Sequence, residues 1–219
     1  MISNEMTPQD IIMEINQYFK KAIVVTDVGQ NQLWTTQFLE LDENKQLLTS
    51  GGMGTMGHGF PAAIGAQLGN PDKTVLAITG DGGFQMNLQE MATATAYELP
   101  VIICIFNNGC LGNVRQWQEI FFHKRYSSTC LQFRKSCNRL CHDETPNCPK
   151  GLPDYQILAQ CYEAMGILVT KKEEIKGAFQ TAENNKKGPT IIEFLIQKED
   201  NVLPIVAPGI PLDQMLLTL

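Results

Sequence analysis

Short apolar runs recur along this chain, and segments with helical patterns lie between most of them. Continuous apolar runs bounded by turn residues are typical of buried strands, and here they are Ala22–Val25, Val75–Ile78, Val101–Phe106, Ile167–Val169 and Ile191–Leu195. Strands that alternate with helices form right-handed βαβ units around a parallel sheet. We therefore expect an α/β fold with a parallel sheet flanked by helices on both faces.

A capped helix is predicted near the start of the sequence. Thr7 is a preferred N-cap residue and Pro8 suits the first helical position. Apolar residues follow at helical spacing, at Ile11, Ile12, Ile15 and Phe19. A single apolar face is typical of a helix that packs on a core, so we expect this helix to pack against the sheet.

Polar segments that carry glycine follow three of the predicted strands. They are Asp27–Gln30, Gly80–Gly83 and Asn107–Gly109. Between the second and third of these segments we expect a helix from about Phe84 to Tyr97. Ligands of open α/β sheets bind at the carboxyl ends of the strands, so these segments are candidates for a binding site.

Two residues at neighbouring strand ends are suited to a magnesium ion. Asp81 offers a carboxylate and Asn108 an amide oxygen, and phosphate oxygens, water or a backbone carbonyl would complete an octahedral shell. The glycines beside Asp81 allow close backbone approach, and a helix N-terminus favours an anion. Either motif alone is more simply a tight turn. The two motifs at this spacing favour a magnesium diphosphate site.

Size and charge narrow the class of protein. The length of 219 residues, 43% of them hydrophobic, suits one domain over residues 1–219. The formal net charge is −6 and no block of Lys and Arg occurs, which argues against a nucleic-acid partner. No segment has the apolar length of a membrane span, and Met1–Lys21 lacks the features of an export signal. We expect a cytoplasmic protein without a membrane partner.

The Gly-Asp-Gly motif, followed by Asn-Asn one helix and one strand later, resembles the signature of thiamine diphosphate enzymes. Four further segments look like acetolactate synthase (acetohydroxyacid synthase) large-subunit sequence, namely Asp27–Gln30, Ser50–Gly57, Phe60–Ala66 and Val114–Trp117. The similarity runs in register from about Thr7 to the C-terminus. The chain therefore resembles the C-terminal thiamine diphosphate-binding domain of that family, and the resemblance implies the pyrophosphate-domain fold.

The resemblance implies thiamine diphosphate and Mg²⁺ as cofactors. It makes Asp81, Asn108 and the backbone carbonyl of Cys110 metal ligands, and it places Met56 under the cofactor, where it enforces a bent conformation. The positions that it assigns to cofactor contact are Val28, Gly29, Gln30, Asn31, Gly54, Met56, Gly80, Asp81, Gly82, Gly83, Asn108, Cys110, Leu111, Gly112 and Asn113.

Two positions near the implied cofactor depart from the family's usual residues, and a third matches a residue of the family's substrate channel. Asn31 stands where the family usually carries histidine, and Asn113 where it usually carries methionine. Both positions lie near the implied cofactor, so the departures bear on affinity and rate. Trp117 matches a tryptophan that lines the family's substrate channel, although a single helical tryptophan can equally be a core or interface residue.

The activity implied by the resemblance is decarboxylation of pyruvate and addition of the resulting enamine to a second 2-oxo acid. The family's enzymes are much longer, with two further domains, and a glutamate from a neighbouring subunit protonates the cofactor. No residue here matches that glutamate, so we expect a homo-oligomer or a complex with a chain that carries the missing domains. FAD is expected only with the missing middle domain. The isolated chain should be inactive.

Two alternatives remain open beside this interpretation. One is a non-catalytic cofactor-binding or regulatory module with the same fold. The other is a different 2-oxo acid decarboxylase that shares the magnesium motif. The G-x-G-x-x-G pattern at Gly52–Gly57 does not favour a dinucleotide site, because no strong apolar strand precedes it and no acidic residue follows at the required spacing. His58 and His123 have no identifiable catalytic partner.

The stretch at about 127–153 is irregular and rich in cysteine, which indicates an insertion or a functional loop. Its cysteines are Cys130, Cys137, Cys141 and Cys148, with His142 among them. The spacing lacks the close cysteine pairs of a zinc site. The chain has seven cysteines and no export signal, which favours reduced thiols or metal ligands over a disulfide framework. A metal or redox role and a plain set of reduced thiols both stay open.

Overall fold

A six-stranded parallel sheet forms the centre of the structure. The computed structural model describes residues 6–135, 137, 151, 153–198, 200–207 and 209–218. The strand order is β2-β1-β3-β4-β6-β5, and every neighbouring pair is parallel. The strands are β1 (Ala22–Thr26), β2 (Gln46–Thr49), β3 (Thr74–Gly80), β4 (Ile102–Asn107), β5 (Met165–Val169) and β6 (Thr190–Leu195). The predicted parallel sheet and its five strands are confirmed.

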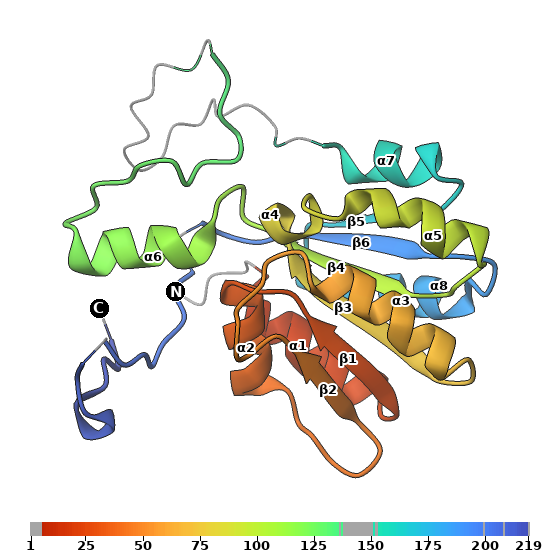
Figure 1. Ribbon diagram of the computed structural model, residues 1–219, viewed down its shortest axis with the longest axis horizontal. Coiled ribbons are helices and arrows are strands. Elements are labelled where there is room, and N and C mark those ends of the chain that lie inside the picture. The colour runs from red at the N-terminus through yellow and green to blue at the C-terminus, as the bar shows by residue number, and fades with distance from the viewer. Residues whose placement is uncertain are drawn as a thin grey trace.

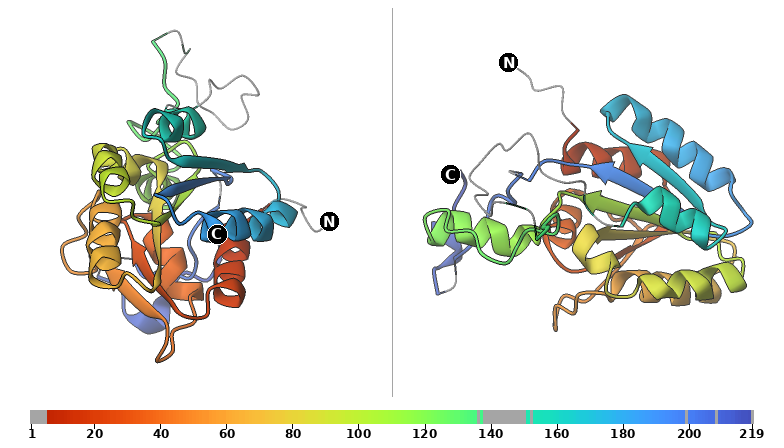
Figure 2. Two further views of the ribbon diagram at one scale, coloured as in Figure 1. Left: turned by 90° about the vertical axis from the view of Figure 1, so that its right-hand side faces the viewer. Right: turned by 90° about the horizontal axis from the view of Figure 1, so that it is seen from above.

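Helices cover both faces of the sheet, as predicted (Figures 1 and 2). On one face lie α1 (Pro8–Tyr18), α2 (Gln30–Phe38) and α8 (Ile175–Asn184), and on the other α3 (Gly59–Gly69), α5 (Met91–Ala96) and α7 (Tyr155–Cys161). Successive strand residues point to opposite faces. In β1, for example, Val24 packs in the first core and Val25 in the second. Each face therefore has its own hydrophobic core.

Strand β2 was not predicted from the sequence. It is the edge strand next to β1, its residues are largely exposed, and only Leu47 and Leu48 of the four are apolar. It leads into the glycine-rich segment Ser50–Gly57, before which no strong apolar strand was expected. The strand is short and largely exposed, unlike the buried strand of a dinucleotide-binding unit.

Helix α1 has the predicted cap and packs as predicted. Thr7 and Asp10 form a capping box, in which Asp10 N donates to Thr7 Oγ1 (3.2 Å) and Thr7 N to Asp10 Oδ2 (3.0 Å). Lys172 Nζ lies 2.6 Å from Asp10 Oδ1. Burial opposes ionisation, but the hydrogen bonds from Lys172 and Thr7 hold the pKa of Asp10 below its usual value. Ile11, Ile12 and Ile15 are fully buried in the first core.

The single helix expected from Phe84 to Tyr97 is wrong. The segment forms the short helix α4 (Asp81–Phe84), the 3-10 turn η1 (Leu88–Glu90) and α5. The break lies at Asn87, which leaves helical geometry with φ −136° and donates from Nδ2 to the carbonyl of Gly57 (2.7 Å). Asparagine side chains compete with helices by bonding nearby backbone. This bond ties the segment to the Ser50–Gly57 loop.

Helix α6 (Gly112–Phe121) covers neither face of the sheet but lies beyond the carboxyl ends of the strands (Figures 1 and 2). After it, residues 127–135 form no helix or strand, although Cys130 makes an isolated bridge with Cys110. Cys141, His142 and Cys148 lie outside the described residues. In the part of the chain that the structure describes, no helix has the length and apolar character needed to cross a membrane.

Candidate cofactor-binding site

A cavity of about 130 Å³ opens at the carboxyl ends of β1, β3 and β4. Its walls come from the segments that follow these strands and from the loop before α3. Every residue predicted to contact the cofactor lines this cavity except Gly54, which lies further out on the exposed loop. Trp34, Phe106 and Val114 also line it and were not predicted. The structure thus brings separated sequence segments into one site.

Asp81 supplies the carboxylate of the cavity. It begins α4 directly after β3 and is 5% exposed. Burial, together with the charge of Glu193, raises the pKa of Asp81 to about 7, although backbone N–H groups of Gly82 and Gly109 donate to the carboxylate and favour ionisation. The cause is that a buried carboxylate loses its hydration. A cation beside Asp81 would favour its charged form.

Neighbouring side chains hold the turn at Asp81 in place. The carbonyl of Asp81 accepts hydrogen bonds from Gln85 Nε2 (2.9 Å) and from the hydroxyl of Tyr155 (3.1 Å). Tyr155 is fully buried and lies edge-on against Phe84. Burial raises the pKa of the Tyr155 hydroxyl well above its usual range, so it remains a hydrogen-bond donor. The carboxylate is therefore carried on a rigid turn.

Asn108 supplies an amide oxygen at the adjacent strand end. Its Oδ1 accepts from the backbone N–H of Cys110 (3.1 Å), and its Nδ2 donates to Gln30 Oε1 (3.2 Å). The backbone N–H of Cys110 can only donate, which identifies the end of the Asn108 amide that it contacts as the oxygen. One N–H donor uses one of the two lone pairs of Oδ1, so the other lone pair remains for a cation.

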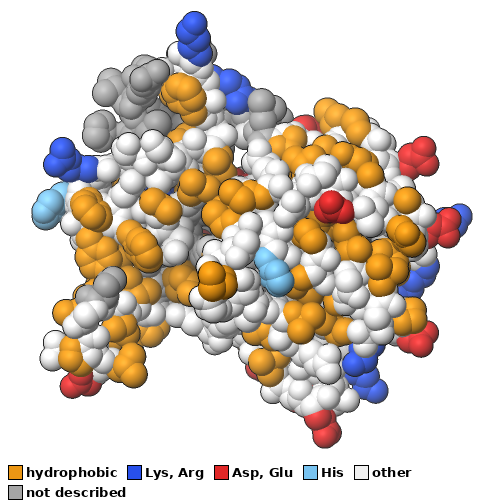
Figure 3. Space-filling model, viewed as in Figure 1, with side chains coloured by type: hydrophobic (Ala, Val, Ile, Leu, Met, Phe, Trp, Pro, Cys, Tyr) orange, Lys and Arg blue, Asp and Glu red, His pale blue; other side chains and the backbone are white. Residues whose placement is uncertain are grey.

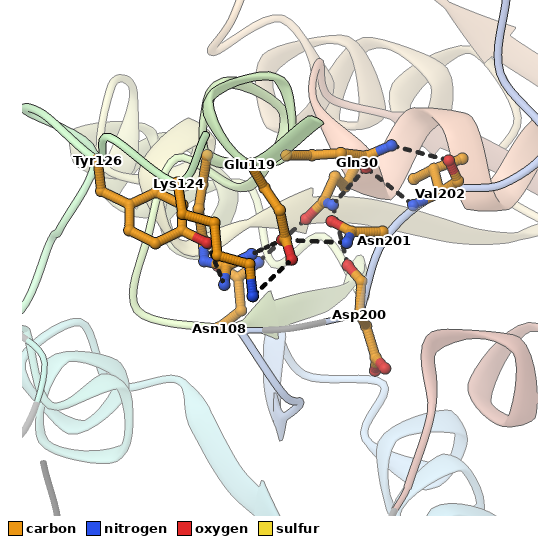
Figure 4. Close-up of polar contacts among 10 residues, drawn as sticks. Gln30, Asn108, Glu119, Lys124, Tyr126, Asp200, Asn201 and Val202 are labelled. Atoms are coloured by element: carbon orange, nitrogen blue, oxygen red, sulfur yellow. Dashed lines mark hydrogen bonds and ion pairs between the residues drawn. The ribbon is translucent and has the colours of Figure 1, made fainter. Parts of the chain in front are cut away.

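A chain of amides extends from Asn108 to the C-terminal part of the structure (Figure 4). Gln30 Nε2 donates to Gln116 Oε1 (2.9 Å) and to the carbonyl of Asp200 (3.0 Å). Gln116 in turn donates to the carbonyl of Val202 and accepts from its N–H, both at 2.8 Å. Gln30 and Asn108 were predicted to contact the cofactor, but the roles of Gln116, Asp200 and Val202 were not, because contacts over 86 and 170 positions leave no local sequence signal. They hold α6 and the segment after β6 against the site.

Gly112 has to be glycine for this arrangement to exist. A Cβ at Gly112 would meet Gln30 Oε1 and would lie 2.7 Å from Asn108 Nδ2. Both contacts are closer than real Cβ atoms approach, and both involve side chains that are already hydrogen-bonded. The first residue of α6 therefore permits the contact between Gln30 and Asn108.

Asp27 holds the loop that carries Met56. Asp27 Oδ1 accepts from the N–H groups of Val28 (2.8 Å) and Gly57 (3.1 Å), and Oδ2 accepts from Gly59 N (2.8 Å). Gly57 has a φ of +88°, which favours glycine. This anchoring brings Met56 into the cavity wall. The segment containing Asp27 was singled out from the sequence, but this anchoring role was not foreseen.

Asn31 has a buried polar atom without a partner. The residue is 4% exposed, it lines the cavity, and its Oδ1 makes no hydrogen bond within the described part of the chain. A buried acceptor left unsatisfied costs about 1–3 kcal/mol. Gly29 and Gly80 provide the space around this side chain, since a Cβ at either position would lie 3.3 to 3.4 Å from Asn31 Nδ2. The site is thus adapted to a polar ligand.

The donor set of the cavity fits a magnesium diphosphate. None of the lining residues is Lys, Arg or His, and Asp81 is their one carboxylate. A bare diphosphate would be repelled by Asp81, whereas a divalent cation can bind both groups. Helices α2 and α6 begin at the cavity, and the first N–H groups of a helix favour anions. No group of three His, Cys, Asp or Glu that could hold a metal without a ligand occurs among the described residues.

Three residues weighed from the sequence lie outside the cavity lining. Trp117 is on α6 and 48% exposed, in a stripe with Val114 and Phe121, which are 45% and 39% exposed. Of the three residues of this α6 stripe, only Val114 also lines the cavity. His58 precedes α3, and His123 follows α6 at a φ of +52°. The channel role of Trp117 stays a prediction.

The fold and the cavity define the class of protein: an α/β domain that binds its ligand at the carboxyl ends of parallel strands. Residues 27–194 match the family model described as "Thiamine pyrophosphate enzyme, C-terminal TPP binding domain". The match spans most of the chain, which therefore belongs to this family of thiamine diphosphate-binding domains.

Among curated proteins the chain is similar to acetolactate synthase large subunits. It is 41% identical to that of Cyanidium caldarium over 98% of the chain and 33% of the relative. It is 37% identical to that of Lactococcus lactis over 98% of the chain and 34% of the relative. It is 40% identical to the Escherichia coli isozyme 2 large subunit over 89% of the chain and 32% of the relative. The chain thus spans about a third of the length of these relatives.

Proposed function

We propose that this chain is the cofactor-binding domain of an acetolactate synthase and holds thiamine diphosphate with Mg²⁺. The observation that carries the proposal is the cavity itself. Its lining combines the segments after β1, β3 and β4 with Met56, and these are the positions at which the sequence resembles the family. The similarity to the relatives named above supports an acetolactate synthase over other 2-oxo acid decarboxylases.

The polar residues of the cavity would hold the cofactor by its diphosphate. Asp81, the Oδ1 of Asn108 and the carbonyl of Cys110 would coordinate the magnesium ion, whose remaining ligands are phosphate oxygens and water. The N–H groups at the starts of α2 and α6 would bind the phosphates. Gln30 keeps Asn108 oriented, and its own amide is held by Gln116. The diphosphate is thereby neutralised without a Lys or Arg in the lining.

Met56 would shape the cofactor. Its Cε lies 3.8 Å from the Cβ position of Gly82, and both residues line the cavity. An unbranched, polarisable side chain fills an irregular space well. When bound, thiamine diphosphate supplies the nucleophilic carbon that decarboxylates pyruvate and passes the two-carbon unit to a second 2-oxo acid. The contribution of this chain is to bind the cofactor, fix its conformation and orient it.

The apolar stripe on α6 supports coverage by further domains or a second subunit. Val114, Trp117 and Phe121 repeat at helical spacing and are each more than a third exposed. Figure 3 shows hydrophobic side chains gathered on this side of the molecule. Large exposed apolar patches mark interaction surfaces. The stripe lies on the helix that begins at the cavity, so a partner seated there would also cover the site.

A binding titration of the whole chain tests the cofactor assignment. Trp34 lines the cavity, so its fluorescence should report thiamine diphosphate bound there. We expect binding that requires Mg²⁺, and the Asp81→Asn variant should bind about tenfold more weakly or worse, because it loses the charged ligand. Asp72→Asn is the matched control, since Asp72 is exposed and precedes β3, at the opposite end of that strand from the cavity. Equal affinity with and without Mg²⁺ would contradict the metal assignment.

An activity assay tests the enzymatic assignment. The chain alone should form negligible acetolactate from pyruvate, and mixing it with a polypeptide that carries the missing domains should restore formation. Acetolactate made by the chain alone would contradict the view that it holds half of an active site. Cofactor binding without activity in the mixture would favour a non-catalytic module. FAD should be needed only in the mixture.

A further inference from the structure

Two cysteines face each other at the wall of the cavity. Cys110 follows β4 and lines the cavity, and Cys130 lies in the irregular stretch after α6. They form an isolated antiparallel bridge, and both are free thiols. Cys110 is 6% exposed, whereas Cys130 is half-buried. Proximity and unequal exposure distinguish this pair from the other described cysteines.

The backbone hydrogen bonds define the geometry of the pair. Leu111 N donates to the carbonyl of Thr129 (2.8 Å), and Leu131 N to the carbonyl of Gly109 (2.9 Å). These bonds flank Cys110 and Cys130 on both sides, which makes them a non-hydrogen-bonded pair. In such pairs the Cα atoms lie about 4.5 Å apart and the side chains project to the same side. Disulfides need Cα separations of about 4.4 to 6.8 Å.

We propose that Cys110 and Cys130 form a reversible disulfide, a modification site on the wall of the cofactor cavity. The oxidant is a low-molecular-weight disulfide such as oxidised glutathione. The more exposed Cys130 sulfur, as thiolate, attacks this disulfide, forms a mixed disulfide and releases one thiol. The Cys110 sulfur then loses its proton, attacks the Cys130 sulfur and releases the second thiol. The protein loses two thiol hydrogens with their electrons, and the small disulfide becomes two thiols.

The bond would hold the cavity wall in place. Leu111 and Leu131, which neighbour the two cysteines, both contact the Cβ position of Gly82, at 2.8 and 3.1 Å. Gly82 lines the cavity, so both strands of the bridge cover the same part of the wall. In the reduced protein the two flanking backbone hydrogen bonds hold the Thr129–Leu131 segment there. Oxidation adds a covalent Cys110–Cys130 link between these two hydrogen bonds. No cofactor takes part, so the inference does not depend on the proposed function.

Peptide mapping of the full chain tests the proposal. The protein is equilibrated with oxidised and reduced glutathione, its thiols are blocked, and it is digested with trypsin for mass spectrometry. Cys130 is the one cysteine of the tryptic peptide 126–134, and Cys110 lies in peptide 74–115 with Cys104. We expect these two peptides to be linked, with fragmentation assigning the bond to Cys110, and dithiothreitol to separate them.

Two variants complete the test. Cys130→Ser should abolish the linked peptide, and Cys161→Ser, which removes an exposed thiol on α7, should retain it. Oxidation should raise the midpoint of thermal unfolding by about 5 °C in the wild type and in Cys161→Ser, but not in Cys130→Ser. A Cys130 that stays a thiol or a glutathione adduct, or that links to any other cysteine, would overturn the proposal. So would a lowered midpoint, because the bond would then distort the native bridge.

Discussion

Replacing Asp81 with asparagine should stabilise the unliganded chain while it weakens cofactor binding. The folded chain keeps Asp81 buried, with a pKa of about 7 in place of the usual 3.8. Between pH 3.8 and about 7 the Asp81 carboxyl of the folded chain therefore holds a proton that the same carboxyl of the unfolded chain has lost. Because the folded state binds more protons, stability falls as the pH rises from 3.8 to about 7 and is level above that. An asparagine stays neutral throughout.

The size of this effect follows from the two pKa values. A tenfold change in ionisation corresponds to about 1.4 kcal/mol. The raised pKa of Asp81 therefore lowers the free energy of unfolding by an amount on the order of 4 kcal/mol at about pH 8. At about pH 5 the reduction is less than half as large. Relative to Asp81→Asn, the free energy of unfolding of the wild type should fall by about 3 kcal/mol between these two conditions.

Urea unfolding at the two pH values, with EDTA and without cofactor, measures the difference. Asp72→Asn, which changes an exposed carboxylate, should follow the wild type. Adding Mg²⁺ and thiamine diphosphate at the higher pH should stabilise the wild type, by mass action, and should stabilise Asp81→Asn by about 1.4 kcal/mol less or by a still smaller amount. If wild type and Asp81→Asn show parallel pH dependence, burial does not disfavour the Asp81 charge, and the reasoning fails.

Four further substitutions separate binding, stability and turnover. Gly112→Ala should weaken Mg²⁺-dependent binding of thiamine diphosphate by about tenfold, measured by calorimetry, because its Cβ displaces side chains of the site; unchanged affinity would contradict the need for glycine. Thr7→Ala should cost about 1 kcal/mol in urea unfolding through loss of the cap, and a neutral result would mean that the capping box does not stabilise α1. Asp10→Asn should remove stability that the wild type has above pH 3.8 and loses as the pH falls below it, so the two proteins should converge in acid. Met56→Ala should lower acetolactate formation by the reconstituted enzyme about tenfold and leave diphosphate affinity within about threefold; equal losses in both would assign Met56 to binding.

The buried strands of this fold could be predicted because both of their faces are apolar. In β1, β3, β4 and β6 nearly every residue is buried, which produces continuous apolar runs in the sequence. Strand β2 has no such run, because it lies at the sheet edge with most of its residues exposed. Its position depends on pairing with β1, which joins residues more than twenty positions apart.

The main lining of the cavity could also be predicted, since strand ends carry it and its residues are consecutive. Asp81 and Asn108 follow β3 and β4, which are adjacent in the sheet, so the topology brings them together. What supports them could not be predicted. Gln116 and Val202 act through contacts over 86 positions, and Asn87 separates α4 from η1 while it bonds to a loop thirty positions away. Such tertiary contacts override local propensity.

The features that suit this cavity to a cofactor are the same ones that destabilise it when no ligand is bound. Asp81 is ionised only against its burial, and Asn31 Oδ1 is buried without a partner in the described part of the chain. The cation of a magnesium diphosphate would stabilise the charged Asp81 carboxylate, and a polar group of the ligand would donate a hydrogen bond to Asn31 Oδ1. Binding and folding are therefore coupled, because the ligand compensates polar groups that the protein leaves uncompensated. The amides of Gln30 and Gln116 make this possible, since they fix Asn108 without placing a competing cation beside Asp81.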